Sequence, residues 1–471
     1  MRGIEILTLE VGSTITKANG FVRLTGGGLD HVAQGFAPTS VAEGDVGIGA
    51  DAALADLAAT SGLDPSGAET FVNSSAAGGL RMTVHGLTLS MTARAAREAA
   101  LGAGGIVKMV TAGELDEFEL DEIRRIRPNL ILLAGGVDYG EKGIVLRNAE
   151  KLAALANGAC GSNHANQANE EERTNAAKDG LPVPVLYAGN AALRRPIEAL
   201  FRAAGVELHV AENVFPDVDV LNVEPLRRLV HEAFNRHIVH APGMARLATL
   251  TRHGILPTPG AVLRAAELFA EVAGDCLVFD VGGATTDVHS VTEGGAEWHS
   301  RLLEPEPRAK RTVEGDLGVY VNARHVVELS GDTAAEAHLE DLAALPATER
   351  ERALTRWLCE KAVAIGARRH AGVVSDLYTP TGRRQVVKGK DLTAVKWVVA
   401  TGGALTKVDG AAECLRAVCT GAGRHLLPDP SATILVDADY RFSALGTLAH
   451  AFPDDVRATF RRWIEALTAT A

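Results

Sequence analysis

The feature that most constrains the fold of this chain is a repeated β-hairpin. Residues 4–35 have the pattern of a three-stranded meander, and residues 276–303 repeat it. A shift of 270 residues places Glu10 opposite Asp280. The repeat therefore predicts an internally duplicated α/β chain with two similar lobes. The expected strands of the second copy are "CLVFDV", "TDVHSVTE" and "AEWHSRLL".

A second pair of related stretches is more ambiguous. Gly135 and Gly136 follow the apolar run "NLILLA", and Gly402 and Gly403 follow "WVVAT". These pairs stand 123 and 120 residues after the first glycines of the two hairpin turns. The similarity fits either a further duplicated element or an ordinary strand–Gly-Gly–helix junction.

With 471 residues, the chain is long enough for several domains. Residues 106–212 alternate strand-like and helical runs, which predicts an inserted or extended segment with its own parallel sheet. The polar stretch 160–180 is expected to be a surface loop. The expected divisions are a first lobe (1–80), the α/β segment (81–222), a helical connector (223–275), a second lobe (276–430) and a return to the first lobe (431–471).

Composition excludes several classes of function. A formal net charge of −12 argues against a nucleic-acid partner, because no basic stripe is present to neutralise phosphates. The first apolar run contains Glu5 and Glu10 and does not suit a signal peptide, and no apolar run approaches the roughly 20 residues that span a bilayer. Five cysteines without a regular spacing favour a reducing compartment, so a cytoplasmic protein is expected.

The turn "FDVGGATTD" has the residues of a phosphate clamp. Gly282 and Gly283 let the main chain approach an anion, and the hydroxyls of Thr285 and Thr286 add donors. Asp280 ends the preceding strand, where a carboxylate holds Mg²⁺ through water and orients a nucleophile.

The turn "LEVGSTITK" supplies a matching set from the first copy. Glu10 is the expected carboxylate and second Mg²⁺ contact, Gly12, Ser13 and Thr14 form the expected clamp, and Lys17 is an expected phosphate contact. One such turn alone is common in sheets without ligands. Two turns in register favour a nucleotide site.

The motifs resemble the phosphate-1, phosphate-2 and adenosine motifs of the actin, Hsp70 and sugar kinase superfamily. The adenosine motif corresponds to "TGGAL", in which Gly402 and Gly403 let the backbone pack against the nucleoside. This resemblance implies a two-lobed, ribonuclease H-like fold that binds ATP and Mg²⁺ between the lobes, with ATPase activity.

Longer strings, spread over nearly the whole chain, resemble the glutamate mutase accessory protein family, often labelled MutL or GlmL. Members of that family are regarded as ATP-dependent reactivating chaperones of adenosylcobalamin-dependent mutases. The expected partners are therefore mutase subunits, and a homo-oligomer is left open. Nothing here resembles a cobalamin-ligating Asp-x-His-x-x-Gly loop, so the cobalamin is expected on the client. The strings are "LAGGVDYGEKGIVLRNAEKLA", "YAGN", "ENVFPDVDVLNVEP", "RTVEGDLGVYVNA" and "GKDLTAVKWVVATGGAL".

The roles of three acidic residues have more than one interpretation. The superfamily usually has Asp where this chain has Glu10, and the longer side chain is expected to affect turnover more than binding. Glu314 and Asp316 in "RTVEGDLG" are either catalytic residues that position water or solvated turn residues.

Two other functions remain in competition. "FDVGGATTDV" also resembles the hydantoinase and oxoprolinase family and acyl or sugar kinases, which implies an ATP-dependent small-molecule enzyme. An actin-like filament is the third reading, because a heterologous interface generates open assemblies.

Overall fold

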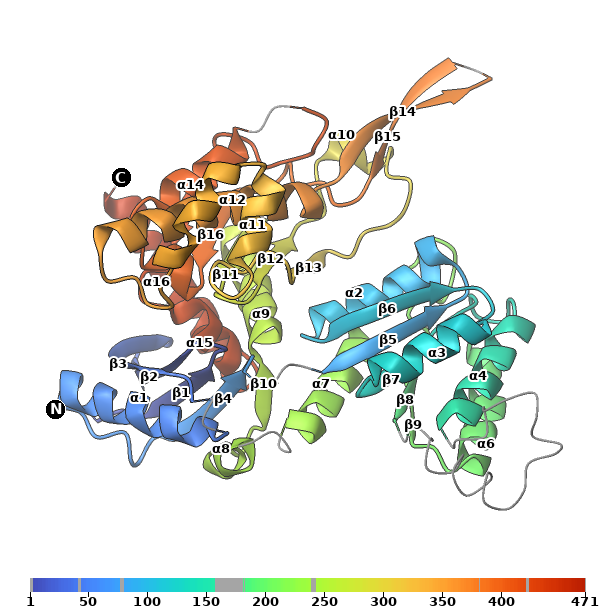
Figure 1. Cartoon of the computed structure of the whole chain (residues 1–471), viewed down its shortest axis with the longest axis horizontal. Coiled ribbons are helices and arrows are strands. Elements are labelled where there is room, and N and C mark those ends of the chain that lie inside the picture. The colour runs from blue at the N-terminus through green and yellow to red at the C-terminus, as the bar shows by residue number, and fades with distance from the viewer. Residues whose placement is uncertain are drawn as a thin grey trace. The chain divides into compact units, whose positions relative to one another are not determined.

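A computed structural model of the chain describes residues 3–40, 44–76, 80–156, 181, 183–238, 243–380, 382–420 and 423–470. The chain forms two compact units (Figure 1). The first contains Met1–Ala77 and Ile238–Ala471, and the second contains Gly78–His237. The second unit therefore interrupts the first in sequence. It includes residues 223–237 of the expected helical connector (223–275), whereas residues 238–275 belong to the first unit.

The first sheet of the first unit has the strand order β3-β2-β1-β4-β10. β1 pairs antiparallel with β2 and parallel with β4. All six residues of β1 are buried, as expected for a central strand covered on both faces. The strands are β1 (Ile6–Val11), β2 (Ile15–Arg23), β3 (Leu29–Pro38), β4 (Glu69–Ser74) and β10 (Ile255–Pro257).

The second sheet repeats this arrangement strand for strand. Its order is β13-β12-β11-β16-β17, and β11 pairs antiparallel with β12 and parallel with β16. The predicted duplication and the two-lobed, ribonuclease H-like actin fold are thus confirmed. The strands are β11 (Cys276–Val281), β12 (Thr286–Val291), β13 (Ala309–Glu314), β16 (Trp397–Thr401) and β17 (Thr433–Val436).

One apolar core joins the two sheets. Helices α9 (Thr258–Ala273), α15 (Arg441–Leu448) and α16 (Pro453–Thr470) contribute side chains to it together with residues of both sheets. α9 and α15 approach so closely that a Cβ on Gly446 would lie 1.9 Å from the carbonyl oxygen of Ala261. Only glycine fits at this crossing.

The C-terminal segment contacts the first sheet. In Figure 1 the red C-terminal helices lie beside the blue strands. Asp455 of α16 accepts a hydrogen bond from the Gly28 backbone N–H at 2.7 Å, and the Thr459 hydroxyl accepts one from the Leu29 N–H at 2.8 Å. Residues more than 420 positions apart therefore share one lobe.

The third strand of the second meander was placed wrongly. Residues 296–303 were expected to form it, but they begin with the short helix α10 (Ala296–His299), and β13 forms the strand instead. β13, "AKRTVE", is polar in sequence, but two of its charged residues are buried in ion pairs: Arg311 pairs with Asp287 at 2.8 Å, and Glu314 pairs with Arg369 at 2.6 Å.

The helices beside the second sheet complete the first unit. α12 and α14 pack against the second sheet's other face, whereas β14 and β15 form a ribbon that projects from the unit (Figure 1). The remaining elements are α1 (Val46–Ser61), α8 (Met244–Leu250), α11 (Ala323–Ser330), α12 (Glu349–His370), β14 (Val373–Thr379), β15 (Gly382–Lys388), α13 (Gly403–Thr406) and α14 (Ala411–Cys419).

The second unit is a parallel sheet of order β6-β5-β7-β8-β9, a doubly wound arrangement. Its interior strand β5, between β6 and β7, was not among the expected strands. Thr83 and His85 make β5 polar, but both are buried, and the His85 imidazole contacts the Thr83 and Thr111 hydroxyls at 2.9 and 2.8 Å. The strands are β5 (Arg81–Gly86), β6 (Ile106–Ala112), β7 (Leu130–Leu133), β8 (Val185–Tyr187) and β9 (Leu208–Val210).

Helices separate these strands, namely α2 (Arg94–Gly102), α3 (Glu117–Ile126), α4 (Gly143–Ala156) and α6 (Arg194–Ala203), with α7 (Glu224–Ile238) at the end. Gly135 and Gly136 follow β7 of this unit, whereas Gly402 follows β16 of the other, whose first-lobe counterpart is β4. The resemblance of the two Gly-Gly stretches is therefore not part of the duplication. The predicted surface loop 160–180 lies outside the described residues. Among the described helices, none is long and apolar enough to cross a membrane.

Candidate functional site

The two hairpin turns have the same backbone geometry. The Gly12 N–H donates to the Ile15 carbonyl at 3.0 Å, and the Gly282 N–H donates to the Thr285 carbonyl at 2.9 Å. Each turn is thus closed by one hydrogen bond between residues three apart, at positions 270 residues apart. The sequence repeat is reproduced as a structural repeat.

The turns approach each other closely. A Cβ placed on Gly283 would lie 3.3 Å from the Thr14 methyl carbon. In the described part of the chain, the backbone N–H groups of Ser13, Thr14, Gly283 and Ala284 donate no hydrogen bond. Free N–H groups on adjacent turns are the donors that a phosphate group requires.

A short segment after β13 braces the second turn. The Gly283 carbonyl accepts hydrogen bonds from the N–H groups of Tyr320 and Val321, at 2.9 and 2.8 Å. The Asn322 side chain donates to the Ala284 carbonyl at 2.8 Å. A Cβ on Gly318 would lie 2.3 Å from the Ala284 backbone, so only glycine permits this approach. Because its carbonyls are engaged by the brace, the turn has a fixed orientation.

Asp280 is the carboxylate with the most perturbed environment at the site. Burial, reinforced by the negative charges of Asp287 and Glu10, raises its pKa to about 7. Within the described residues its side chain has no hydrogen-bond or ion-pair partner. An unpaired, partly buried carboxylate beside the expected phosphate clamp is suited to a Mg²⁺ contact or to accepting a proton.

Asp287 is anchored one strand away. It lies directly opposite Asp280 in the β11–β12 register and pairs with Arg311 at 2.8 Å. Both partners are buried, and desolvation raises the pKa of Asp287 despite the guanidinium. The guanidinium therefore pairs directly with Asp287, whereas the charges of Arg311 and Lys17 only partly offset the burial of Asp280.

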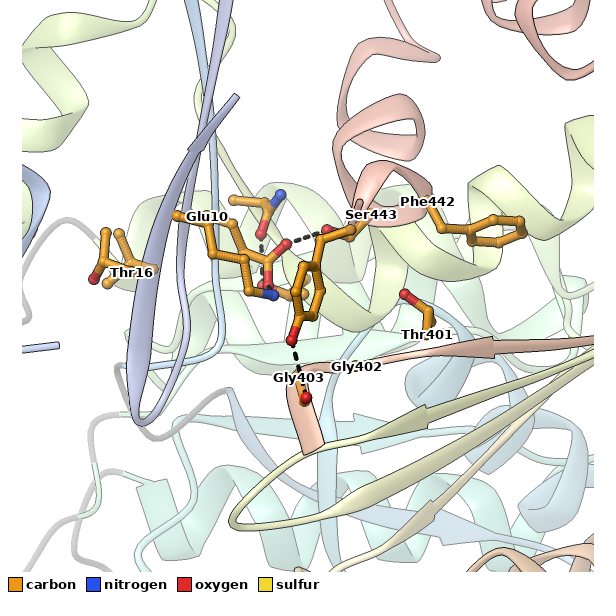
Figure 2. A network of polar contacts seen from close by, with 12 residues as sticks. Glu10, Thr16, Thr401, Gly402, Gly403, Phe442 and Ser443 are labelled. Atoms are coloured by element: carbon orange, nitrogen blue, oxygen red, sulfur yellow. Dashed lines mark hydrogen bonds and ion pairs between the residues drawn. The ribbon is translucent and has the colours of Figure 1, made fainter. Parts of the chain in front are cut away.

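Glu10 is already engaged. Its carboxylate accepts a hydrogen bond from Lys17 Nζ at 2.6 Å and another from the Ser443 hydroxyl of α15. Figure 2 shows the Glu10 side chain directed toward Ser443. Burial opposes the charge on Lys17, but the adjacent Glu10 carboxylate outweighs it, so the pKa of Lys17 lies above its ordinary value. Lys17, expected as a phosphate contact, is the counter-charge of Glu10 in this structure.

Tyr440 connects the first hairpin to the expected adenosine turn. Lys17 Nζ lies 4.3 Å from the centre of the Tyr440 ring, and the Tyr440 hydroxyl donates to the Gly403 carbonyl at 2.9 Å. Tyr440 adopts a left-handed conformation, with φ of 54°, at the start of α15. Gly402, with φ of 85°, lies so near Asp280 that a Cβ would be 2.5 Å from its Oδ1 atom. The expected adenosine turn therefore lies against the end of β11, directly before the second hairpin turn.

Glu314 and Asp316 share one arginine. Arg369 of α12 donates to Glu314 at 2.6 Å and to both oxygens of Asp316 at 2.8 and 3.0 Å. Glu314 is buried at the end of β13, opposite Thr286, whereas Asp316 is partly exposed. The guanidinium, chiefly through its hydrogen bond, lowers the pKa of Asp316.

One of the two expected threonine donors, Thr286, already has a partner. The Thr286 hydroxyl donates to the Leu317 carbonyl at 2.8 Å and is buried, so the brace already uses it. Sequence reasoning missed Ser443, Tyr440, Arg369 and Asn322, which meet the site from distant segments. No local pattern marks them, although Asn322 lies within the string "RTVEGDLGVYVNA".

The side chains at the site fit a magnesium nucleotide in part, because the carboxylate of Asp280 is available as a ligand. Mg²⁺ in nucleotide sites is held by one or two carboxylates, and phosphate and water complete its shell. Asp280 is available for this, whereas Glu10 first has to leave Lys17 or bind through water. No cluster of three or more His, Cys, Asp or Glu side chains with metal-site geometry occurs in the residues that the structure describes.

Comparison with known proteins agrees with the resemblance seen in the sequence. Residues 6–464 match the family described as MutL protein. A curated relative, "Protein MutL" from Clostridium tetanomorphum, is 34% identical over 484 residues, which cover 97% of this chain and 98% of that protein. The chain belongs to the MutL family.

Solved structures related to this MutL family member are more distant. They include nucleotide-free acetone carboxylase (12% identity, TM-score 0.38, covering 95% of this chain and 70% of the other). Another is the nucleotide-free diol dehydratase-reactivating factor (14% identity, TM-score 0.34, covering 95% of this chain and 100% of the other). A third is a glycerol dehydratase reactivase (12% identity, TM-score 0.33, covering 94% of this chain and 99% of the other). Because their TM-scores lie below 0.5, these structures do not indicate the function of this chain.

Proposed function

We propose that this protein is an ATP-dependent reactivating chaperone that exchanges damaged cobalamin from an adenosylcobalamin-dependent mutase such as glutamate mutase. The observation that carries the nucleotide part is the approach of two equivalent turns with free N–H groups beside the unpaired Asp280. Membership of the MutL family supports the assignment of a mutase as the client.

The residues divide the work of nucleotide binding. The N–H groups of Ser13, Thr14, Gly283 and Ala284 bind phosphate oxygens from two lobes at once. Gly402 and Gly403 lie against the nucleoside, as the adenosine motif implies. Asp280 would hold Mg²⁺, and the ion would supply charge stabilisation for the phosphoryl group. Glu314 or Asp316 positions the attacking water.

The two lobes transmit the nucleotide state of this protein to the client. Each lobe supplies one phosphate turn, so binding and loss of the γ-phosphate change the free energy of holding the two turns together. Tyr440 and Ser443 link α15 to both the first hairpin and the adenosine turn. A radical enzyme that has lost its adenosyl group retains damaged cofactor in a closed site, and a docked ATPase that changes shape opens that site.

The test uses purified protein, Mg-ATP and glutamate mutase inactivated by bound hydroxocobalamin. Added adenosylcobalamin should restore mutase activity only when this protein and ATP are both present. ADP in place of ATP, and the Asp280→Asn variant, are the matched controls. Absence of recovery across several mutases, with ADP release stimulated by a metabolite, would replace the proposal by an ATP-dependent small-molecule enzyme of the hydantoinase or kinase type.

A further inference from the structure

The exposed large apolar side chains of the second unit are gathered at one edge of its sheet. All five strands are parallel, so the loops that follow them share the carboxyl edge. Leu89 follows β5, Phe118 opens α3 after β6, and Tyr139 follows β7, with exposed fractions of 64%, 86% and 79%. Val218 and Val220 follow β9. Within the described part of this unit, no other large apolar side chain is exposed.

The two loops that carry Tyr139, Val218 and Val220 are fixed by polar contacts with each other and with the loop after β8. Asp138 accepts hydrogen bonds from the Ala191 N–H at 2.8 Å and from Asn213 Nδ2 at 2.9 Å. Asn190 accepts one from the Tyr139 N–H at 2.8 Å and donates to the Glu141 carbonyl at 3.0 Å.

These contacts tie the loops after β7, β8 and β9 together. Asn190 and Asn213 are buried, and Tyr139 is held at φ of 64°, a conformation that few residues other than glycine adopt. Apolar side chains on preorganised loops lose little conformational entropy when a partner binds them. The edge therefore has the properties of a docking surface.

The charge of the edge selects the class of partner. The loops comprise residues 87–93, 113–119, 134–143, 188–195 and 211–223. Their exposed basic side chains are Lys142 and Arg195. Their exposed carboxylates are Glu114, which pairs with Arg147 and Lys151 of α4, and Asp116, Glu117, Glu212, Asp217 and Asp219.

An acidic surface of this kind repels nucleic-acid phosphates and anionic lipid headgroups. A second copy of the chain, with a formal net charge of −12, is disfavoured for the same reason. The apolar side chains project from the loops, and projecting aromatic groups fill recesses on a partner. The complementary partner is a protein surface with an apolar recess bordered by Lys and Arg.

We propose that the edge formed by Leu89, Phe118, Tyr139, Val218 and Val220 is the surface through which this protein docks on its client mutase. The inference rests on the proposed function for the identity of the client. Phe118 and Tyr139 are the expected anchors, because large exposed aromatic side chains dominate the affinity of protein interfaces.

The test measures direct binding of the full-length protein to glutamate mutase by biolayer interferometry at low and moderate salt. The double substitution Phe118→Ala, Tyr139→Asn removes both rings, and asparagine tolerates the left-handed conformation at position 139. We expect the Kd to rise at least tenfold while ATP hydrolysis stays unchanged, and wild-type binding to weaken as salt rises. Tyr378→Ala is the matched control, because Tyr378 is 77% exposed on the β14–β15 ribbon of the other unit.

Wild-type affinity in the double variant, or loss of binding in the Tyr378→Ala control alone, would overturn the docking surface. A change of solution mass in the double variant with mutase binding unchanged would assign the edge to contacts between copies of this chain, which also overturns it. The proposed function is judged separately by recovery of mutase activity. If the wild-type protein binds the mutase through this edge but does not restore mutase activity with ATP, the docking surface stands and the proposed function is wrong.

Discussion

Thr14 of the first phosphate turn and Gly283 of the second face each other so closely that a Cβ on Gly283 would lie 3.3 Å from the Thr14 methyl carbon. The two residues belong to different lobes and are separated by 269 positions in the sequence. Their approach places free N–H groups of both turns around one location. The proposed phosphate site is therefore a property of the lobe pair and not of either turn alone.

Two glycine substitutions separate binding from folding. Gly283→Ala adds a methyl group beside Thr14 and Tyr320, each 3.3 Å away, without a positive φ. We expect nucleotide affinity to fall at least tenfold with thermal stability nearly unchanged, as isothermal titration calorimetry and calorimetric unfolding would show.

Gly402→Ala should act differently. Its φ of 85° and the 2.5 Å approach to Asp280 Oδ1 and the Val281 N–H nitrogen leave no room for a Cβ. We expect a loss of about 2 kcal/mol or more in the free energy of unfolding. Equal stability of the two alanine variants would contradict this view of the adenosine turn.

Asp280→Asn should stabilise the protein at neutral pH. Burial and the neighbouring acids raise the pKa of Asp280 to about 7, above the ordinary value of 3.8. A raised carboxyl pKa means that the folded state binds more protons, so this group's contribution to the free energy of unfolding falls as pH rises from about 4 to 7. Asparagine avoids that penalty.

We expect an increase of about 2 kcal/mol in the free energy of unfolding of Asp280→Asn at pH 8, vanishing near pH 4. Urea unfolding at the two pH values measures it, and Asp316→Asn serves as a control because arginine lowers rather than raises the pKa of Asp316. An Asp280→Asn variant that is less stable than wild type at pH 8 would show that the carboxylate has a stabilising partner.

Lys17→Met should destabilise the first lobe. Without the ammonium group, the buried Glu10 carboxylate retains only the Ser443 hydroxyl, and breaking one side of a buried ion pair costs about 3 kcal/mol. The double variant Glu10→Gln, Lys17→Met should recover most of this loss, because no buried charge remains. A double variant as unstable as Lys17→Met would indicate that packing against Tyr440, and not charge, holds Lys17.

Glu314→Gln should lower the turnover of ATP more than its binding. Glu314 is buried at the end of β13, where Arg369 Nη1 donates to one of its oxygens at 2.6 Å. We expect kcat to fall about tenfold to a hundredfold with little change in KM. Asp316→Asn should change kcat less, because Arg369 engages both of its oxygens. The reverse order of effects in steady-state ATPase kinetics would move the water-positioning role to Asp316.

Local sequence patterns predicted the parts of the fold whose residues are apolar or small. The strand "CLVFDV" coincides with β11, and the 270-residue repeat gave the register of both turns. β13 and β5 escaped prediction because their polar side chains are buried against partners from other segments: Arg369 for Glu314, and Thr111 for His85. Polar patterns predict exposure only when such partners are absent.

The site was predicted in its turns but not in its surroundings. The spacing of the glycines and of the strand-end acids predicts their place in the turns. The contact of Ser443 with Glu10, by contrast, joins residues 433 positions apart. Lys17 was expected to contact phosphate. In the structure its ammonium group donates to the Glu10 carboxylate instead. Side-chain pairing at a distance leaves no periodic trace in the sequence.

The measurement that tests the central claim most directly is the release of bound hydroxocobalamin from inactivated glutamate mutase. Cobalamin is quantified by its absorbance in the filtrate after ultrafiltration, with Mg-ATP and either wild-type protein or the Asp280→Asn variant. The account predicts release with wild-type protein and ATP, and release reduced at least tenfold with ADP or with Asp280→Asn. Equal release by the variant, or release that does not depend on ATP, would contradict the claim that the paired phosphate turns drive reactivation.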